Sequence, residues 1–108
     1  MQVSDFRKIL DETGFAVGYY QFPKGKVPKL PYILFYFPTS DDVYADNKNY
    51  VNIQATNVEL YTKNKNFSAE KSVEDVLKSH NIKYQKTETY LTTEDMFLIL
   101  YEMEIITD

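Results

Sequence analysis

An apolar run enclosed by two prolines constrains the fold of this chain more than any other stretch. Between Pro31 and Pro38 the sequence is YILFYF. Such a run is too short for a globular helix, and it is rich in the residues that favour strands. We therefore predict a central β-strand over residues 32–37 that is buried on both faces of a sheet.

Hydrophobic periodicity predicts the remaining elements around this strand. One amphipathic helix of about ten residues begins with Ser4 as its cap and stops at Gly14. A second helix, capped by Ser68 or Ser72, ends near Asn81. Strands are predicted over residues 15–22, 50–62, 82–91 and 96–106.

Two of these strands carry finer predictions. The apolar positions of the 50–62 strand change face, which predicts a bulge near Thr56 and Asn57. The last strand is apolar on both sides at first and on one side later, so its first half is predicted to be buried on both faces. The strand over residues 82–91 is expected near an edge.

The elements follow in the order α-β-β-β-α-β-β. Short connections favour antiparallel neighbours, and the second helix allows one crossover. At 108 residues the chain is long enough to bury one core. We predict a single α+β domain over residues 1–108, with a mainly antiparallel twisted sheet and two helices packed on one face.

Charge and composition exclude several classes of function. The chain has 12 basic and 16 acidic residues, and its net charge of −4 argues against phosphate-driven nucleic-acid binding and against a membrane surface. It has no cysteine, so thiol catalysis, thiolate metal sites and disulfides are absent. The N-terminal sequence lacks the apolar segment of a signal peptide, and no apolar run approaches the ~20 residues that span a bilayer.

The residues that carry chemistry elsewhere form no recognisable catalytic set here. The three glycines are dispersed, which excludes a glycine-rich phosphate loop. His80 is the single histidine and is predicted to lie at a helix end, where the dipole favours it. Glu102 and Glu104 share one side of a strand and are interpreted as solubilising charges. We expect no enzyme activity, catalytic residue, cofactor or metal.

Two polar segments are the candidates for protein contacts. The first, over residues 39–49, has aspartates without the spacing of an EF-hand, so turn formation is the alternative to a functional role. The second is a lysine-containing loop, for which a solvated loop is the alternative. Ten tyrosines suit either an interface or a β-rich core. The residues we assign to protein interaction are Asp41, Asp42, Tyr44, Asp46, Asn47, Lys24, Lys26 and Lys29.

Several stretches make the chain resemble a known family. They are Leu30-Pro31-Tyr32 with Tyr36 and Pro38, Ala45-Asp46-Asn47-Lys48, Val58-Glu59-Leu60-Tyr61-Thr62, Glu88-Thr89-Tyr90 and Leu100-Tyr101-Glu102. In order and spacing they resemble small head–tail connection proteins of long-tailed bacteriophages and prophages of Gram-positive bacteria, of the tail-terminator type. The likeness covers nearly the whole chain.

This resemblance implies a virion structural protein. Tail terminators are small α+β proteins that form hexameric rings on the last ring of tail-tube subunits, stop tube growth and offer a surface to the head connector. The implied partners are other copies of the chain, the tail-tube protein and the head-connector protein, without sequence-specific nucleic acid or membrane. The implied location is the head–tail interface of the virion, after assembly in the host cytoplasm. The resemblance also allows the free subunits to be monomers in solution.

Two other classes of function stay open at this point. The first alternative is a small acidic adaptor or inhibitor, encoded by a mobile element, that binds a protein through its tyrosines. Neighbouring genes for portal, capsid and tail proteins would favour the virion hypothesis over this one. The second alternative is a hydrolase that uses His80 with carboxylates, and it requires turnover that is lost in His80→Ala.

Overall fold

The computed structural model describes the backbone of residues 1–39, 43–45 and 48–107, and the side chains of residues 1–39 and 53–107. The predicted helices and strands occur in the predicted order. A short additional strand, β3, lies in the segment that we predicted to be a polar connection. The elements are α1 (Val3–Asp11), β1 (Ala16–Tyr19), β2 (Tyr32–Tyr36), β3 (Val43–Ala45), β4 (Lys48–Thr62), α2 (Phe67–Ser79), β5 (Tyr84–Leu91) and β6 (Met96–Thr107).

The main sheet has the strand order β1-β2-β4-β6-β5, and β3 pairs with β4 outside this path. The pairs β2–β4, β4–β6 and β5–β6 are antiparallel, whereas β1 and β2 are parallel. A parallel pair needs a connection of about a dozen residues or more. Residues 20–31 supply this connection as a loop without a helix. Because three of the four strand pairs in the main sheet are antiparallel, the prediction of a mainly antiparallel α+β sheet is confirmed.

Each helix begins earlier than its predicted cap. In α1 the backbone N–H of Gln2 donates to the Asp5 carboxylate at 2.8 Å, so the helix starts ahead of Ser4. In α2 the side chain of Asn66 accepts from the backbone N–H of Ala69 at 3.0 Å, and the predicted serine caps are therefore wrong. An amide oxygen two or three residues upstream of the free N–H groups satisfies them as well as a serine would.

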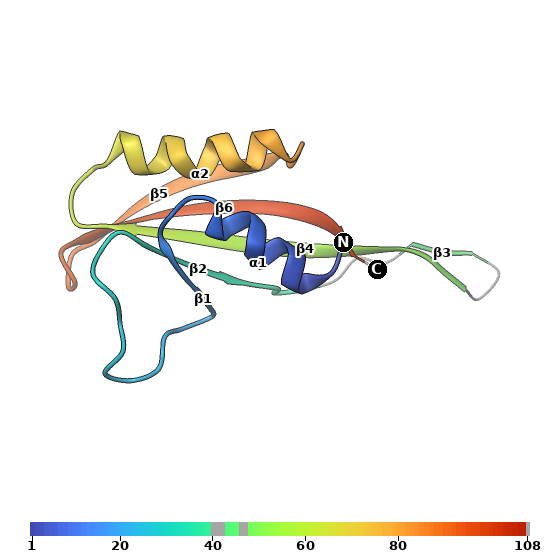
Figure 1. The fold of residues 1–108 in the computed structure, drawn as a ribbon, viewed down its shortest axis with the longest axis horizontal. Coiled ribbons are helices and arrows are strands. Elements are labelled where there is room, and N and C mark those ends of the chain that lie inside the picture. Colours follow the sequence, from blue (N-terminus) through green and yellow to red (C-terminus); the bar gives the residue numbers. More distant parts are fainter. Residues whose placement is uncertain (40–42, 46–47, 108) are drawn as a thin grey trace.

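Both helices pack on the same face of the sheet. The Phe6 ring of α1 lies 5.7 Å from the Phe35 ring of β2, and the Tyr101 hydroxyl of β6 donates to Glu74 of α2 at 2.8 Å. Figure 1 shows α2 running along β5 and α1 in front of the central strands. The buried cluster between helices and sheet contains Phe6, Ile9, Leu10, Val17, Ile33, Phe35, Val58, Leu60, Ala69, Val73, Leu77, Ile82, Ile99, Tyr101, Met103 and Ile105.

The central strand β2 is buried differently from our prediction. Ile33 and Phe35 face the helices and are 0% and 2% exposed, but Tyr32 and Tyr36 on the opposite face are only half-buried. Of that opposite face, Leu34 is well covered because the Phe22 side chain lies over the β1–β2 edge. The helices cover one side of the sheet only, which makes the prediction of two buried faces wrong.

The predicted bulge in β4 is also wrong. Its register with β6 runs without a shift from Asn52, opposite Thr107, to Thr62, opposite Phe97. Ile53 and Ala55 simply lie on the face away from the helices, where they are half-buried. In β6, Ile99 is buried while Leu98 and Leu100 are half-buried, so its first half is not enclosed on both sides as predicted.

One pair of leucines tests this one-sided layering. Leu60 is 0% exposed beneath the helices, whereas Leu98 lies on the open face. We expect Leu60→Ala to lower the free energy of unfolding by about 2–5 kcal/mol, because it leaves a cavity that cannot collapse. Leu98→Ala should cost less than half as much. Urea unfolding of the two variants measures the difference, and equal losses would contradict a single covered face.

Candidate functional site

The longest strand extends beyond the sheet to which it belongs. Pairing of β4 with β6 begins at Asn52, so the residues before it pair only with β3. In this hairpin Val43 lies opposite Val51 and Ala45 opposite Lys48. We call β3 together with residues 48–51 the arm. Figure 1 shows the arm projecting from one end of the molecule, past the ends of its neighbours.

Part of the predicted interaction segment belongs to the arm. Tyr44 lies in β3, where its backbone is paired with that of Asn49, and its side chain is outside the described residues. Asp41, Asp42, Asp46 and Asn47 are outside the described residues altogether. Their role in protein contacts stays a prediction.

The predicted lysine loop lies elsewhere. Lys24, Lys26 and Lys29 are exposed between β1 and β2, in a turn closed by the hydrogen bond from the Lys26 N–H to the Pro23 carbonyl at 2.9 Å. We call residues 23–29 the lysine loop. Figure 1 shows it below the sheet, at the opposite end of the long axis from the arm. The fold therefore does not bring the two predicted segments together.

An open, tyrosine-rich sheet face was missed by the sequence analysis. Cross-strand register places Tyr61 opposite Tyr32 and Leu98, and Glu59 opposite Leu34 and Leu100, on the side away from the helices. The Tyr32 and Tyr61 ring centroids are 5.2 Å apart. The members of this surface, which we call the tyrosine face, are Tyr32, Tyr36, Glu59, Tyr61, Leu98 and Leu100.

Hydrogen bonds order the polar atoms of the tyrosine face. The Tyr61 hydroxyl donates to Glu59 Oε1 at 3.0 Å, and the Asn57 side-chain amide donates to the Tyr36 hydroxyl at 3.1 Å. Burial raises the pKa of Glu59, and the hydrogen bond from Tyr61 partly offsets this. Burial and the nearby Glu59 both raise the pKa of Tyr61, so its phenol stays neutral and keeps donating. This arrangement suits a contact surface that is partly apolar and partly anionic.

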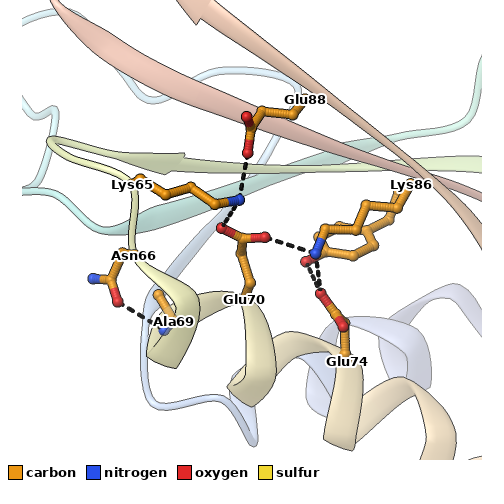
Figure 2. Close-up of polar contacts among 8 residues, drawn as sticks. Lys65, Asn66, Ala69, Glu70, Glu74, Lys86 and Glu88 are labelled. Atoms are coloured by element: carbon orange, nitrogen blue, oxygen red, sulfur yellow. Dashed lines mark hydrogen bonds and ion pairs between the residues drawn. The ribbon is translucent and has the colours of Figure 1, made fainter.

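A second cluster of ionisable groups surrounds a buried carboxylate between α2 and the sheet. Glu70 is 2% exposed and forms ion pairs at 2.6 Å with both Lys65 and Lys86. Figure 2 shows the two lysines approaching Glu70 from either side, with Lys65 continuing to Glu88 and Lys86 to Glu74. A carboxylate enclosed in this way cannot meet a substrate, so the cluster fixes α2 to β5.

The charges of this cluster hold each other ionised. Burial alone would raise the pKa of Glu70, but the contacts with Lys65 and Lys86 outweigh it and hold that pKa below its ordinary value. Burial likewise opposes the charge of Lys86, yet its contacts with Glu70 and Glu74 raise its pKa to about 12. Glu70 and Lys86 are therefore both charged at neutral pH.

The remaining candidate groups form no catalytic arrangement within the described part of the chain. His80 caps the end of α2, and its Nε2 lies 2.9 Å from Glu12 Oε2 at the end of α1, which joins the two helices. Among residues 1–39 and 53–107, no group of three His, Cys, Asp or Glu side chains is placed to hold a metal ion. Neither described helix is long and apolar enough to cross a membrane.

Comparison with known proteins gives a likeness of fold. No protein-family model matches the chain, and no curated protein matches it in sequence. Among solved structures, it is similar to a chain of the virion of a native gene transfer agent particle, with a TM-score of 0.60 and 14% identity. The match covers 91% of this chain and 82% of that chain. The two chains share a fold.

The Glu70 cluster makes the free energy of unfolding depend on pH in the acidic range. Because the pKa of Glu70 is lowered in the folded state, its stabilising effect is present above its unfolded pKa of about 4.3 and is lost as the pH falls through the folded value. We expect Glu70→Gln to lower the free energy of unfolding by about 1–3 kcal/mol at pH 7, because Lys65 and Lys86 each lose one charged partner and keep only Glu88 and Glu74. The variant should also lose less stability than the parent between neutral pH and pH ~3.

Urea unfolding at a series of pH values measures both effects. Glu94→Gln is the matched control, because Glu94 is exposed in the β5–β6 turn and has no ion pair within the described residues. It should leave the stability and its pH dependence unchanged. An acid profile of Glu70→Gln that parallels the parent would contradict the role of the cluster.

Proposed function

We propose that this chain is a virion structural protein of the phage type, a tail terminator that caps the tail tube and forms part of the head–tail junction. It would act by self-assembly into a ring, hexameric as in the family that the sequence resembles, and not by catalysis. The likeness of fold to a chain of a gene transfer agent virion supports a virion role. The observation that carries the proposal further is the arm.

The arm is hard to explain as part of an isolated subunit. A two-stranded hairpin without a third strand or a covering helix is marginally stable in water. Residues 48–51 of β4 pair with β3 alone, and β3 is only 3 residues long. A neighbouring subunit or the end of the tail tube would supply the missing packing. Tyr44 in β3 is the side chain that we expect to make this contact.

The surfaces of the chain also suit a ring. Closed rings require heterologous contacts, in which two different patches of the subunit meet. The arm and the lysine loop lie at opposite ends of a molecule that extends 51 Å along its longest axis. The net charge of −4 would let DNA pass a central opening without adhering to it. The partners would be further copies, the tail-tube protein and the head-connector protein, in the virion.

Removing the arm tests this function. We expect deletion of residues 41–49 to leave a folded subunit, because the pairing of β4 with β6 begins at Asn52 and its pairing with β2 at Asn57. Phage or prophage particles produced with this variant should carry tails that grow beyond normal length and remain unattached to heads. Electron microscopy of induced lysates measures tail length and attachment.

Circular dichroism and thermal unfolding of the purified variant show whether it has folded. Thr93→Ala, in the exposed turn between β5 and β6, is the control and should give normal particles. Normal-length tails joined to heads in the presence of the folded deletion variant would contradict the proposed function. Portal, capsid and tail genes next to the coding sequence would support it.

A further inference from the structure

The tyrosine face lacks a covering layer although its composition is that of an interface. Both helices lie on the opposite side of the sheet, and Tyr32, Tyr36, Tyr61, Leu98 and Leu100 are half-buried. Tyrosine and apolar side chains together are typical of the buried centre of protein interfaces. This surface is therefore ready to receive a partner without rearrangement of the fold.

The charged side chains that the strands present on this side of the sheet are negative, and Lys83, which lies just before β5, lines the same hollow as Glu102 and Glu104. Register places Glu102 opposite Asn57 and Glu104 opposite Ala55, and alternation puts both on the same side as Glu59. The described strands present no lysine or arginine on this side. Neither Glu102 nor Glu104, which are exposed, forms an ion pair within the described residues. A partner for this face would carry positive charge.

The chain itself contains a segment with the complementary character. Residues 13–39 include three lysines and no aspartate or glutamate. All three lysines lie in the lysine loop, are exposed, and form no ion pair within the described part of the chain. Between them Val27 is 60% exposed, so the loop combines an apolar tip with flanking positive charges.

The loop is held in place at its base. Gly18 lies beneath the Phe22 ring, where an added Cβ would come within 2.8 Å of Phe22 Cε1. The same ring packs edge-on against Tyr32, with centroids 5.2 Å apart. The loop therefore starts from the border of the tyrosine face but carries its lysines beyond it, as Figure 1 shows for the segment before β2. Complementary surfaces that do not meet within one copy are free to meet between copies.

We propose that the lysine loop of one copy docks on the tyrosine face of a second copy. Val27 would contact the tyrosine rings, and the lysines would pair with Glu102 and Glu104 or lie over the rings as cation–π contacts. The two patches differ, so the contact is heterologous and repeats from copy to copy. The inference rests on the self-assembly in the proposed function and identifies the interface that would join neighbouring subunits.

Zero-length cross-linking of lysine to carboxylate tests this contact directly. Equal amounts of full-length unlabelled and ¹⁵N-labelled protein are mixed at low salt, treated with a carbodiimide and analysed by mass spectrometry. We expect mixed-isotope links from Lys24, Lys26 or Lys29 to Glu102 or Glu104. Their yield should fall as salt shortens the screening length from about 30 Å at 0.01 M to about 8 Å at 0.15 M.

Charge reversal separates this interface from non-specific attraction. The reversed side chains cannot form the original cross-link, so for these variants we measure the fraction of the protein that is associated in dimers or larger assemblies. The loop-reversed variant, Lys24→Glu with Lys26→Glu and Lys29→Glu, should lower the associated fraction about tenfold. The face-reversed variant, Glu102→Lys with Glu104→Lys, should do the same. Mixing the two variants should restore association. Lys8→Glu with Lys71→Glu and Lys78→Glu has the same charge change on the exposed side of the helices and should associate normally.

Each other outcome overturns the inference. Mixed-isotope links that are absent, or that map to the helical side, would exclude the loop-to-face contact, as would failure of the two reversed variants to restore association. Binding of DNA or of a basic protein by the face, without self-links, would assign the face to another partner. Overlong tails in the arm deletion together with absent links would reject the interface alone, whereas loop-to-face links with normal tails would reject the proposed function alone.

Discussion

The pairing of β4 with β6 is the interaction on which the other parts of this structure depend. Eleven residue pairs, from Asn52–Thr107 to Thr62–Phe97, align two strands that α2 and β5 separate in the sequence. Once these strands are joined, β2 and β5 add to their outer edges and α2 packs over the centre. The loop-closure entropy of this long-range contact is offset by a register that buries Val58, Leu60, Ile99 and Tyr101 together on one side.

The sequence predicted this architecture well where the spacing of apolar residues shows which positions are buried. It predicted burial poorly where this depends on whether helices cover one face of the sheet or both. Phe6, Ile9 and Leu10 recur at helical spacing, and α1 forms around them. The YILFYF run was equally clear as a strand, but a run of apolar residues does not reveal that only one side is covered, because tyrosine tolerates half-exposure. A signal was present in Glu59, whose charge between Val58 and Leu60 marks the open side.

The candidate surfaces were predictable to different degrees for the same reason. The lysine loop could be located because prolines and Gly25 break any regular pattern there. The arm could not be located in this way, because β3 pairs with the part of β4 that continues past the other strands, and the sequence does not show how far β4 continues. The tyrosine face is assembled from three strands that are distant in sequence, and only the cross-strand register brings Tyr32, Tyr61 and Leu98 side by side.

The packing of Phe22 over Gly18 has a consequence for how relatives of this chain can diverge. Any side chain at position 18 would displace the ring, so a small residue at 18 and an aromatic residue at 22 should change together during evolution. Residues 23–29 beyond this contact bury nothing in the main cluster and are free to vary in length and charge. A lineage could thus change the length and charge of this loop, and with them one end of the molecular surface, while the sheet that carries the loop stays the same.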